Sequence, residues 1–378
     1  MIMKKKTFII GSGVLLFLVI IVSSYNVGKR SETIMIPSKE ENHSDDQKTR
    51  PFQVKTIYRL PKANGLLGWS SSDSVVGFFK GDETSERTIH RLQHLSSPYE
   101  KLENLKGIES NTSNLKMSPD GKSIAGLTVS SNKASMKLFS LANGKKTEIT
   151  SFASSKEVFV QNVSWSNNSR YVCYLLINAG QDGQDSLHVF NTDSGTLKTY
   201  SLKDFAEKDS LTGVNISDDG RHLLFTVLQQ SGEQCIIMGT ISDNQIKIQN
   251  KRQNSYGEPV WLTNDQFVFL GTGETLYEYD RRNGELSALL EKVAIFKFSN
   301  DRKKIAYSLD EKDSIYAGKL QGKNILYEEP VYHGTIPSEI YWSPDGNSLL
   351  LNAQNQQSSM ESASARFFDG QAYIITFK

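Results

Sequence analysis

YWSPDGNSLL, residues 341–350, decides the predicted fold because it combines a bulky aromatic side chain, a tight turn and the start of an apolar run. In SPDG, serine suits the first corner of a β-turn, proline the second and glycine the fourth. The runs EIYW before the turn and SLLLN after it are apolar and rich in residues that favour strands. The stretch therefore predicts a β-hairpin and not a helix.

The same pattern of a bulky residue, a turn and an apolar run occurs seven times in the sequence. All four tryptophans of the chain fall at the bulky position, and successive copies are separated by 48, 48, 51, 45, 37 and 44 residues. A period of about 45 residues with several short strands per unit is typical of β-propeller blades, which have four antiparallel strands each. We therefore expect an all-β, seven-bladed β-propeller over residues 52–378. The seven bulky residues are Trp69, Met117, Trp165, Ile216, Trp261, Phe298 and Trp342.

An apolar residue stands two positions before the bulky residue in every copy. Because alternate residues of a strand face the same side, these two positions are expected to share a buried face. Some copies, such as WLTNDQ and FSNDRK, lack the glycine of the turn. There we expect Asn or Asp to supply both the local hydrogen bonds and the left-handed backbone angles.

A ring of blades has to close, because an open first or last blade would expose long sheet edges. The seventh unit supplies only three strands, the last of them in QAYIITFK. FQVKTIYRL, residues 52–60, is an alternating run that precedes the first unit. We expect this run to complete the last blade as its outermost strand.

The SPDG units with a preceding aromatic residue resemble the TolB-like and WD-like propeller repeats of bacterial extracytoplasmic proteins. The resemblance covers residues 52–378. It implies a propeller that acts mostly as a binding platform, since few such rings are enzymes. TolB itself resembles a six-bladed ring with an additional N-terminal domain, and the segment that precedes the repeats here is too short to supply that domain.

The N-terminal segment has the pattern of a membrane anchor. Lys4, Lys5 and Lys6 precede an uncharged run over residues 7–28, which as a helix is roughly 33 Å long and spans a bilayer. The positive-inside rule places residues 1–6 in the cytoplasm and the bulk of the chain on the extracytoplasmic side of the cell membrane. The alternative is a cleaved secretory signal. Residues 29–51 are polar and charged and are expected to form a disordered tether.

Composition excludes several classes of function. Lys plus Arg number 43 against 42 Asp plus Glu, and this balance does not favour nucleic-acid binding. Cys173 and Cys235 both lie in apolar runs, are too few for a disulfide framework and are expected to be buried. Neither follows the apolar N-terminal run directly, so lipid attachment is not expected.

The candidate binding site lies three residues before the bulky position. If the first strand of each blade lines a central channel, Asn114, Asn162, Glu258 and Glu339 form a polar ring at its mouth, with Lys116 and Lys297 deeper inside. Convergent polar groups in a concavity make the default binding-site hypothesis. The alternative is that water in the channel satisfies these groups and that they bind nothing. A second candidate surface is the loop 353–370, with Phe367 and Phe368, whose aromatic rings belong either to a recognition loop or to the core.

No cofactor, metal or nucleophilic site is predicted. His90 and His94 invite a metal hypothesis, but no further ligands accompany them in the sequence. NAGQDGQDS, residues 178–186, lacks the alternating ligands of a calcium loop. The sequence also lacks the Gly-x-Ser-x-Gly motif of a serine hydrolase.

The sequence favours a membrane-anchored propeller that binds a protein or a cell-envelope component and has no enzymatic activity. The alternative is an envelope hydrolase or lyase, lactonase-like or glycan-cleaving, with Glu258 and Glu339 as an acid and base in the channel. A purely structural assembly factor is a third hypothesis. The oligomeric state is not predicted by any of these patterns.

Overall fold

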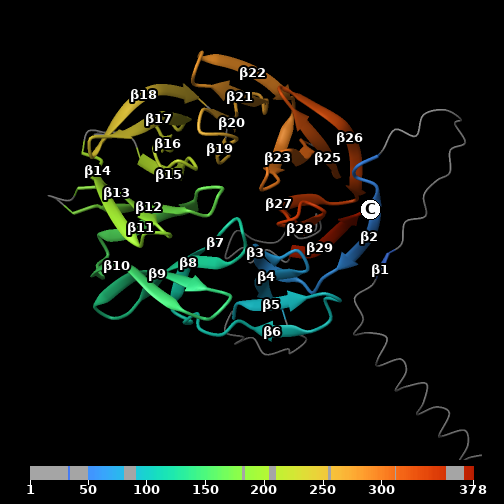
Figure 1. The fold of residues 1–378 in the computed structure, drawn as a ribbon, viewed down its shortest axis with the longest axis horizontal. Coiled ribbons are helices and arrows are strands. Elements are labelled where there is room, and N and C mark those ends of the chain that lie inside the picture. The colour runs from blue at the N-terminus through green and yellow to red at the C-terminus, as the bar shows by residue number, and fades with distance from the viewer. Residues whose placement is uncertain are drawn as a thin grey trace, which may run out of the picture.

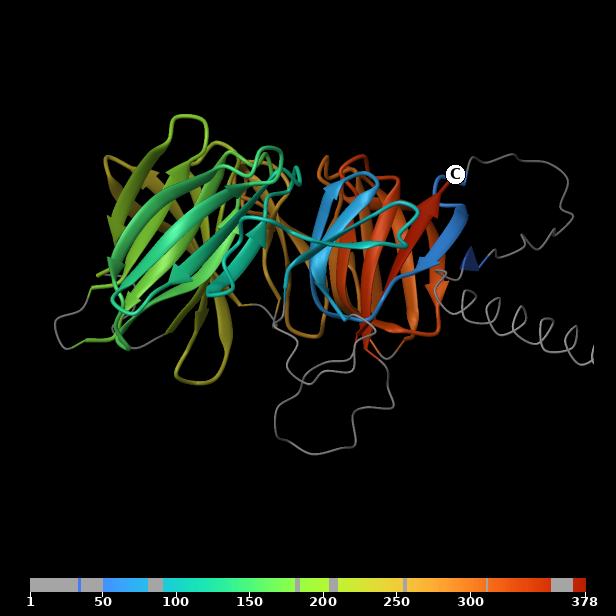
Figure 2. The same cartoon turned by 90° about the horizontal axis from the view of Figure 1, so that it is seen from below.

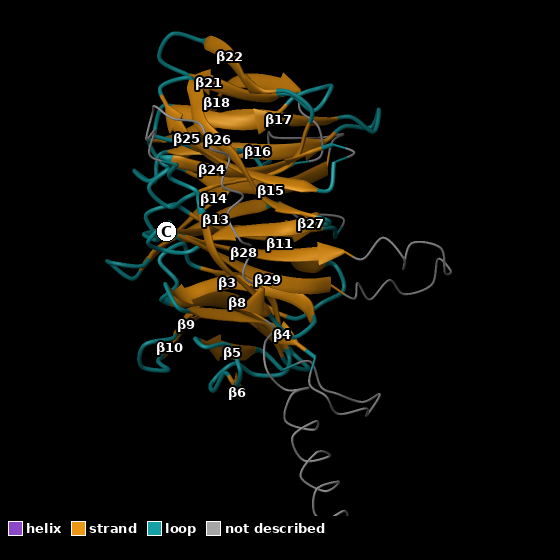
Figure 3. Cartoon of the chain, turned by 90° about the vertical axis from the view of Figure 1, so that its right-hand side faces the viewer, coloured by secondary structure: helices purple, strands orange, loops and turns teal. Residues whose placement is uncertain are grey.

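The computed structural model describes residues 33–34, 50–80, 91–180, 184–203, 210–253, 257–310, 312–354 and 370–378. In these ranges the chain forms strands, turns and loops (Figure 3). Within them, the search for a helix both long and apolar enough to cross a membrane finds none. The predicted cytoplasmic residues 1–6 and anchor 7–28 lie outside the described residues, as does most of the tether 29–51.

Five separate four-stranded antiparallel sheets make up most of the described chain. The first contains β7 (Thr112–Met117), β8 (Ser123–Val129), β9 (Lys133–Ser140) and β10 (Lys146–Ala153). The second contains β11 (Val158–Trp165), β12 (Tyr171–Asn178), β13 (Ser186–Asn191) and β14 (Thr196–Ser201). The third contains β15 (Ser210–Ile216), β16 (His222–Leu228), β17 (Gln234–Ser242) and β18 (Gln245–Gln253). The fourth contains β19 (Val260–Trp261), β20 (Gln266–Leu270), β21 (Leu276–Asp280) and β22 (Glu285–Leu290). The fifth contains β23 (Val293–Phe298), β24 (Lys304–Leu309), β25 (Ser314–Gln321) and β26 (Asn324–His333).

A sixth sheet of nine strands brings the two ends of the described chain together. A single pairing, Gly370 with Ala63, joins its two halves. One half contains β3 (Ala63–Ser71), β4 (Ser74–Phe79), β5 (Gln93–Ser96) and β6 (Leu102–Asn104). The other contains β27 (Ile336–Trp342), β28 (Ser348–Gln354), β29 (Gly370–Phe377), β2 (Val54–Arg59) and β1 (Thr33–Ile34).

The predicted pairing of residues 52–60 with the C-terminal strand is present. Strand β2 runs antiparallel to β29, with Ile57 opposite Ile375. On its other edge β2 pairs with β1, so that Thr33 lies opposite Tyr58. The sequence did not predict this additional strand in the tether, because two residues are too few to show a β pattern.

The sheets are arranged in a ring, with the first strand of each sheet nearest the centre and the last at the periphery (Figure 1). Seen from the side, the strands run between the two faces of the ring (Figure 2). The turns between first and second strands, such as Ser118–Lys122 between β7 and β8, lie together on one face, which we call the turn face. Each first strand runs toward the turn face.

The hydrophobic core lies between neighbouring sheets, because each sheet has two apolar faces that have to be buried. One cluster joins Cys173 and Leu187 to Val214 and Phe225 of the next sheet, and all four are buried. The bulky residues fill these interfaces, with Trp69, Trp261 and Trp342 each at most 5% exposed. Two positions earlier the apolar residues are buried or half-buried, so the predicted shared face is confirmed.

The four tryptophans also tie neighbouring sheets together through their indole groups. Each Nε1 donates a hydrogen bond to the backbone carbonyl of the residue just before the bulky position in the preceding sheet. The pairs are Trp69 with Tyr341 at 3.2 Å, Trp165 with Lys116 at 3.1 Å, Trp261 with Asn215 at 3.3 Å and Trp342 with Lys297 at 3.0 Å.

Serine and aspartate hold the turns together by the same contacts in several repeats. In SPDG of the second repeat, Ser118 Oγ donates to Asp120 Oδ1 at 2.6 Å and accepts from the amide of Ser123 at 3.0 Å. Gly121 takes the left-handed φ of +74° at the fourth corner. A Cβ atom at this residue would lie 2.5 Å from the carbonyl oxygen of Trp69, so that glycine is required by packing as well as by φ.

One expectation about the turns without glycine is wrong. In FSNDRK, Asp301 supplies the local hydrogen bonds, but the left-handed angle falls on Arg302, with φ of 58°. In WSNNSR it falls on Ser169, with φ of 61°. In these two turns, as in the turns that have glycine, the left-handed angle falls at the fourth corner, whereas no residue of the turn in WLTNDQ has a left-handed angle. Arg302 is stabilised in this conformation because its guanidinium binds the Leu262 carbonyl and Asp218.

Candidate binding site

A cavity of about 350 Å³ lies at the centre of the ring, and we call it the channel. All seven repeats contribute to its lining both the bulky residue and the residue immediately before it. Every one of these preceding residues belongs to the first strand of its sheet, so the ring closure brings residues from distant repeats together. They are Gly68, Lys116, Ser164, Asn215, Val260, Lys297 and Tyr341.

The backbone bulges just before these channel residues in most of the sheets. The register between the first and second strands shifts between Gln161 and Val163, for example, and between Pro337 and Glu339. At two of the bulges an asparagine has a left-handed backbone, with φ of 51° at Asn114 and 53° at Asn162. Asparagine tolerates this conformation better than most residues, because its short polar side chain can hydrogen-bond locally.

The two asparagines of the predicted polar ring hydrogen-bond to the neighbouring sheet. Asn114 Nδ2 donates to the carbonyl of Val160 at 3.1 Å. Asn162 Oδ1 accepts from the amide of Val214 at 3.2 Å. Asn162 lines a second cavity of about 330 Å³, whereas Asn114 is not among the lining residues of either cavity. Their contacts connect consecutive sheets in the same way as the indole bonds.

Glu258 and Glu339 both line the channel, and their role in binding a ligand stays a prediction. Glu339 Oε2 accepts from the amide of Leu66 at 3.4 Å and from Asn352 Nδ2 at 3.1 Å. Glu258 Oε2 lies 3.9 Å from Lys116 Nζ, and 62% of the Glu258 side chain is exposed. Glu258 also lines the second cavity, so it lies where the two cavities adjoin.

Lys297 and Tyr341 face each other in the channel. The Lys297 ammonium lies 6.0 Å from the centre of the Tyr341 ring, and the Tyr341 hydroxyl donates to the Leu66 carbonyl at 3.1 Å. Lys297 is exposed, yet desolvation by the ring that surrounds it lowers its pKa; the charge of Lys116 lowers the pKa further and Glu258 raises it. Burial, Glu339 and Glu258 in turn raise the pKa of Tyr341.

Hydrogen bonds cross the channel at the turn face. Asn300 Nδ2 donates at 2.7 Å to the carbonyl of Pro119, which lies 181 residues away in the sequence. Asn167 Nδ2 donates to the carbonyl of Trp261 at 2.9 Å. Arg302 Nη2 forms an ion pair with Asp218 Oδ2 at 2.7 Å. These contacts join sheets that are not neighbours in the ring, and they lie across the channel at the turn face.

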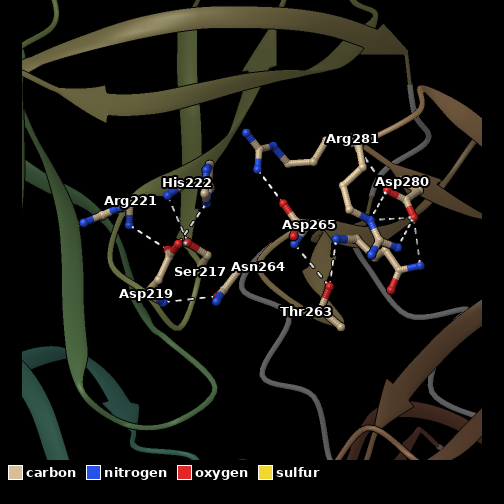
Figure 4. A network of polar contacts seen from close by, with 11 residues as sticks. Ser217, Asp219, Arg221, His222, Thr263, Asn264, Asp265, Asp280 and Arg281 are labelled. Carbon is tan, nitrogen blue, oxygen red and sulfur yellow. Dashed lines mark hydrogen bonds and ion pairs between the residues drawn. The ribbon is translucent and has the colours of Figure 1, made fainter.

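A second set of polar contacts connects adjacent turns around the ring (Figure 4). The amide of Asp219 donates to Asn264 Oδ1 at 3.1 Å. Arg281 forms an ion pair with Asp265 at 2.5 Å, and His222 Nδ1 lies 3.3 Å from Asp219 Oδ2. Sequence analysis had not singled out these residues, although the Ser-x-Asp pattern of the turns marks part of the network.

The remaining sequence candidates carry no site in the described chain. Within the described ranges the search finds no group of three or more His, Cys, Asp or Glu residues placed to hold a metal ion. His94 Nε2 is 2.8 Å from Ser70 Oγ, and His90 lies outside the described residues. The same is true of residues 355–369 of the second candidate surface, including Phe367 and Phe368, and of residues 181–183 in the rejected calcium loop. Cys173 and Cys235 are buried and form no disulfide within the described ranges.

The chain matches no family model and no curated protein. The β-propeller domain of the Trilobed protease from Pyrococcus furiosus is similar in structure, with TM-score 0.53, 12% identity and coverage of 85% of this chain and 94% of that chain. An oligogalacturonate lyase in complex with manganese matches with TM-score 0.52 and 10% identity, over 92% of this chain and 98% of that chain. The tricorn protease matches with TM-score 0.49 and 13% identity, over 80% of this chain, which spans 37% of the protease. With identities this low the likeness concerns the fold alone, and the chain has the fold of a β-propeller.

Proposed function

We propose that this chain is a seven-bladed, TolB-like propeller, anchored in the cell membrane by residues 7–28, that binds a protein or cell-envelope component on the extracytoplasmic side. The blade count is supported by the seven repeats and by their sheets. Five repeats have four strands each, β3–β6 form a sixth set, and β27–β29 with β2 form a seventh. The proposed topology follows from the basic N-terminal residues and the apolar run.

The observation that carries the binding function is the channel. Every repeat contributes one residue at the same position in its first strand. Apolar, amide, hydroxyl and charged groups therefore converge on one cavity of about 350 Å³. Cavities of about 300–1,000 Å³ with a few convergent polar groups are typical of ligand sites. Glu258 and Lys116, each about half exposed, are accessible to a ligand.

The contacts of the two carboxylates favour binding over catalysis. Glu339 accepts hydrogen bonds from Leu66 and Asn352 through Oε2, which fix the carboxylate in place. Glu258 is paired with Lys116 across 3.9 Å. A general acid and base need two carboxyl groups with divergent environments, and here protein groups engage both carboxylates.

The binding function can be tested with a photo-crosslinking amino acid at position 258 of the full-length chain in intact cells. Lys122 is the matched control position, because it has the same 3.9 Å ion-pair distance, to Asp120, and is exposed on the turn face. We expect a specific adduct from position 258 and none from position 122. Equal adducts from both positions, or none from position 258, would contradict the proposal, and mass spectrometry of the adduct distinguishes protein from glycan.

An envelope lyase or hydrolase is the second candidate function. The observation that favours it is that both carboxylates line the same cavity as Lys297 and Tyr341, on a fold shared with the oligogalacturonate lyase. The test is chain cleavage of oligogalacturonate with and without manganese, measured by the ultraviolet absorbance of an unsaturated product. Activity that is lost in both Glu258→Gln and Glu339→Gln supports the enzyme. Absence of turnover by the parent chain rejects it, and turnover that survives both substitutions rejects the two carboxylates as its acid and base.

A further inference from the structure

The charged side chains that line the channel differ in whether another protein group neutralises them. Arg302 is paired with Asp218, and Glu258 with Lys116. Glu339 is bound by two hydrogen-bond donors. Lys297 is the exception. Among the described residues, no carboxylate lies within ion-pair distance of its ammonium and no hydrogen bond to that ammonium is formed.

Lys297 is exposed, but its ammonium gains no counter-charge from the protein, and the ring around it removes part of its hydration. The Tyr341 ring offers Lys297 a weak cation–π contact at 6.0 Å. The second ammonium of the channel, on Lys116, repels it. Glu258 attracts Lys297 but lies beyond ion-pair distance and is already paired with Lys116.

We propose that the channel is an anion site, in which a carboxylate or phosphate group of the bound component lies between Lys297 and Lys116. This inference rests on the proposed binding function and names the chemistry that is recognised. An anion in this position compensates Lys297 and at the same time relieves the repulsion between the two ammonium groups. Charge-assisted hydrogen bonds to carboxylate or phosphate are about twice as strong as neutral ones.

The size and closure of the channel restrict how the anion is presented. A volume of about 350 Å³ is close to the lower limit for ligand pockets, and a helix with side chains is about 10–12 Å across. The channel therefore accepts a small molecule or a single projecting group, and not a folded segment. Because the bonds of Asn300, Asn167 and Arg302 cross the channel at the turn face, the group reaches the lysines from the opposite face.

The test is competitive acetylation of the full-length chain, with each lysine quantified by peptide mass spectrometry. The probes are inorganic phosphate and acetate, each compared with sodium chloride at equal ionic strength. We expect at least a fivefold fall in the acetylation rate of Lys297, because a bound anion shields the amine and keeps it protonated. Lys303, which is exposed at the turn of the same sheet, serves as the control and keeps its rate. The probe that protects at the lower concentration identifies the group as phosphate or carboxylate.

Two variants make the result specific. Lys116→Met removes the second ammonium, and the probe concentration for half-protection of Lys297 should rise at least fivefold. Lys303→Met should leave that concentration unchanged. An unchanged Lys297 rate with both probes, or equal protection of Lys297 and Lys303, overturns the anion site.

The acetylation result is distinguishable from the crosslinking result. If phosphate and acetate do not protect Lys297 from acetylation while the crosslinked adduct at position 258 still forms, only the anion inference is overturned. Protection of Lys297 without any adduct overturns the proposed partner and leaves the anion site supported.

Discussion

The indole Nε1 of Trp342 donates a hydrogen bond of 3.0 Å to the backbone carbonyl of Lys297. This contact connects the bulky residue of the seventh repeat to the strand that carries the channel lysine of the sixth. The same bond occurs at the other three tryptophans, and it is impossible where Met117, Ile216 or Phe298 holds the position. The tryptophans therefore fill the space between sheets and also fix the strands from which the channel side chains project.

Trp342→Phe should lower the free energy of unfolding by about 1–3 kcal/mol, because the aromatic packing remains while the Lys297 carbonyl loses its indole donor. Urea unfolding of the full chain measures the change. Tyr327→Phe, on an exposed aromatic residue, is the control and should change stability by less than about 0.5 kcal/mol. Equal stability of Trp342→Phe and the parent chain would show that the indole bond contributes nothing.

Phe52→Ala should destabilise the ring by about 3–5 kcal/mol. Phe52 is 1% exposed, and its ring lies 6.2 Å from that of Trp342 and 5.6 Å from that of Phe377. It thus anchors the N-terminal strand that closes the last set of strands. Phe159→Ala is the matched control, because Phe159 is 42% exposed. If thermal unfolding showed the same Tm for both variants, the closing strand would not contribute to stability as we infer.

Gly121→Ala should cost more stability than Gly144→Ala. Both glycines have left-handed φ angles, +74° and +67°, so alanine pays the same backbone penalty of about 1–2 kcal/mol at either position. Only at Gly121 does the new Cβ atom collide with a backbone carbonyl, that of Trp69. Chemical denaturation should therefore show an additional loss of about 1–3 kcal/mol for Gly121→Ala. Equal losses would mean that the neighbouring sheet moves aside freely.

Stability should fall as the pH is lowered from about 6.5 to 4, because of His188. Burial lowers the pKa of this histidine to about 4, compared with about 6.5 in an unfolded chain. The unfolded state therefore binds more protons in this window, and the free energy of unfolding falls by about 3 kcal/mol when the window is crossed. The pKa of His222 is also lowered, mainly by burial, and contributes with the same sign.

His188→Phe should flatten this pH dependence, since phenylalanine keeps the stacking on Tyr174 but does not titrate. Urea unfolding at pH 7 and pH 4.5 gives the slope for the variant and the parent chain. The residual slope of the variant reports His222 together with the carboxylates whose pKa the fold shifts, such as Asp280, whose pKa is lowered to about 2 chiefly by its hydrogen bond with Arg282. An undiminished slope would locate the acid sensitivity elsewhere.

The sequence predicted the fold well because a propeller repeats one local pattern. The hairpin pattern around Trp342 recurs at a nearly fixed period. Closure of the ring was predictable because an open first or last blade would expose unpaired strand edges. For the same reason the pairing of residues 52–60 with the C-terminal strand was predictable. The two-residue strand Thr33–Ile34 was not, because its pairing depends on the exposed edge of β2 and not on its own residues.

The site was predicted only in part. Glu258 and Glu339 line the channel as expected, but counting positions by strict alternation ignored the bulges near Asn114 and Asn162. A bulge changes which side of the strand a residue faces, and these asparagines bond to the next sheet. One signal in the sequence could have indicated these bulges. It is an asparagine within an apolar strand, because asparagine tolerates a left-handed backbone. The bond from Asn300 to Pro119 had no local signal, since it depends on the closed ring.

That bond has a kinetic consequence. Because Asn300 and Pro119 meet across the ring, a ligand of the kind proposed would enter and leave the channel through the face opposite the turns. A second ligand would then bind only after the first had dissociated. The rate of ligand exchange should therefore equal the rate at which the bound ligand dissociates. It should not increase with the concentration of a competing ligand.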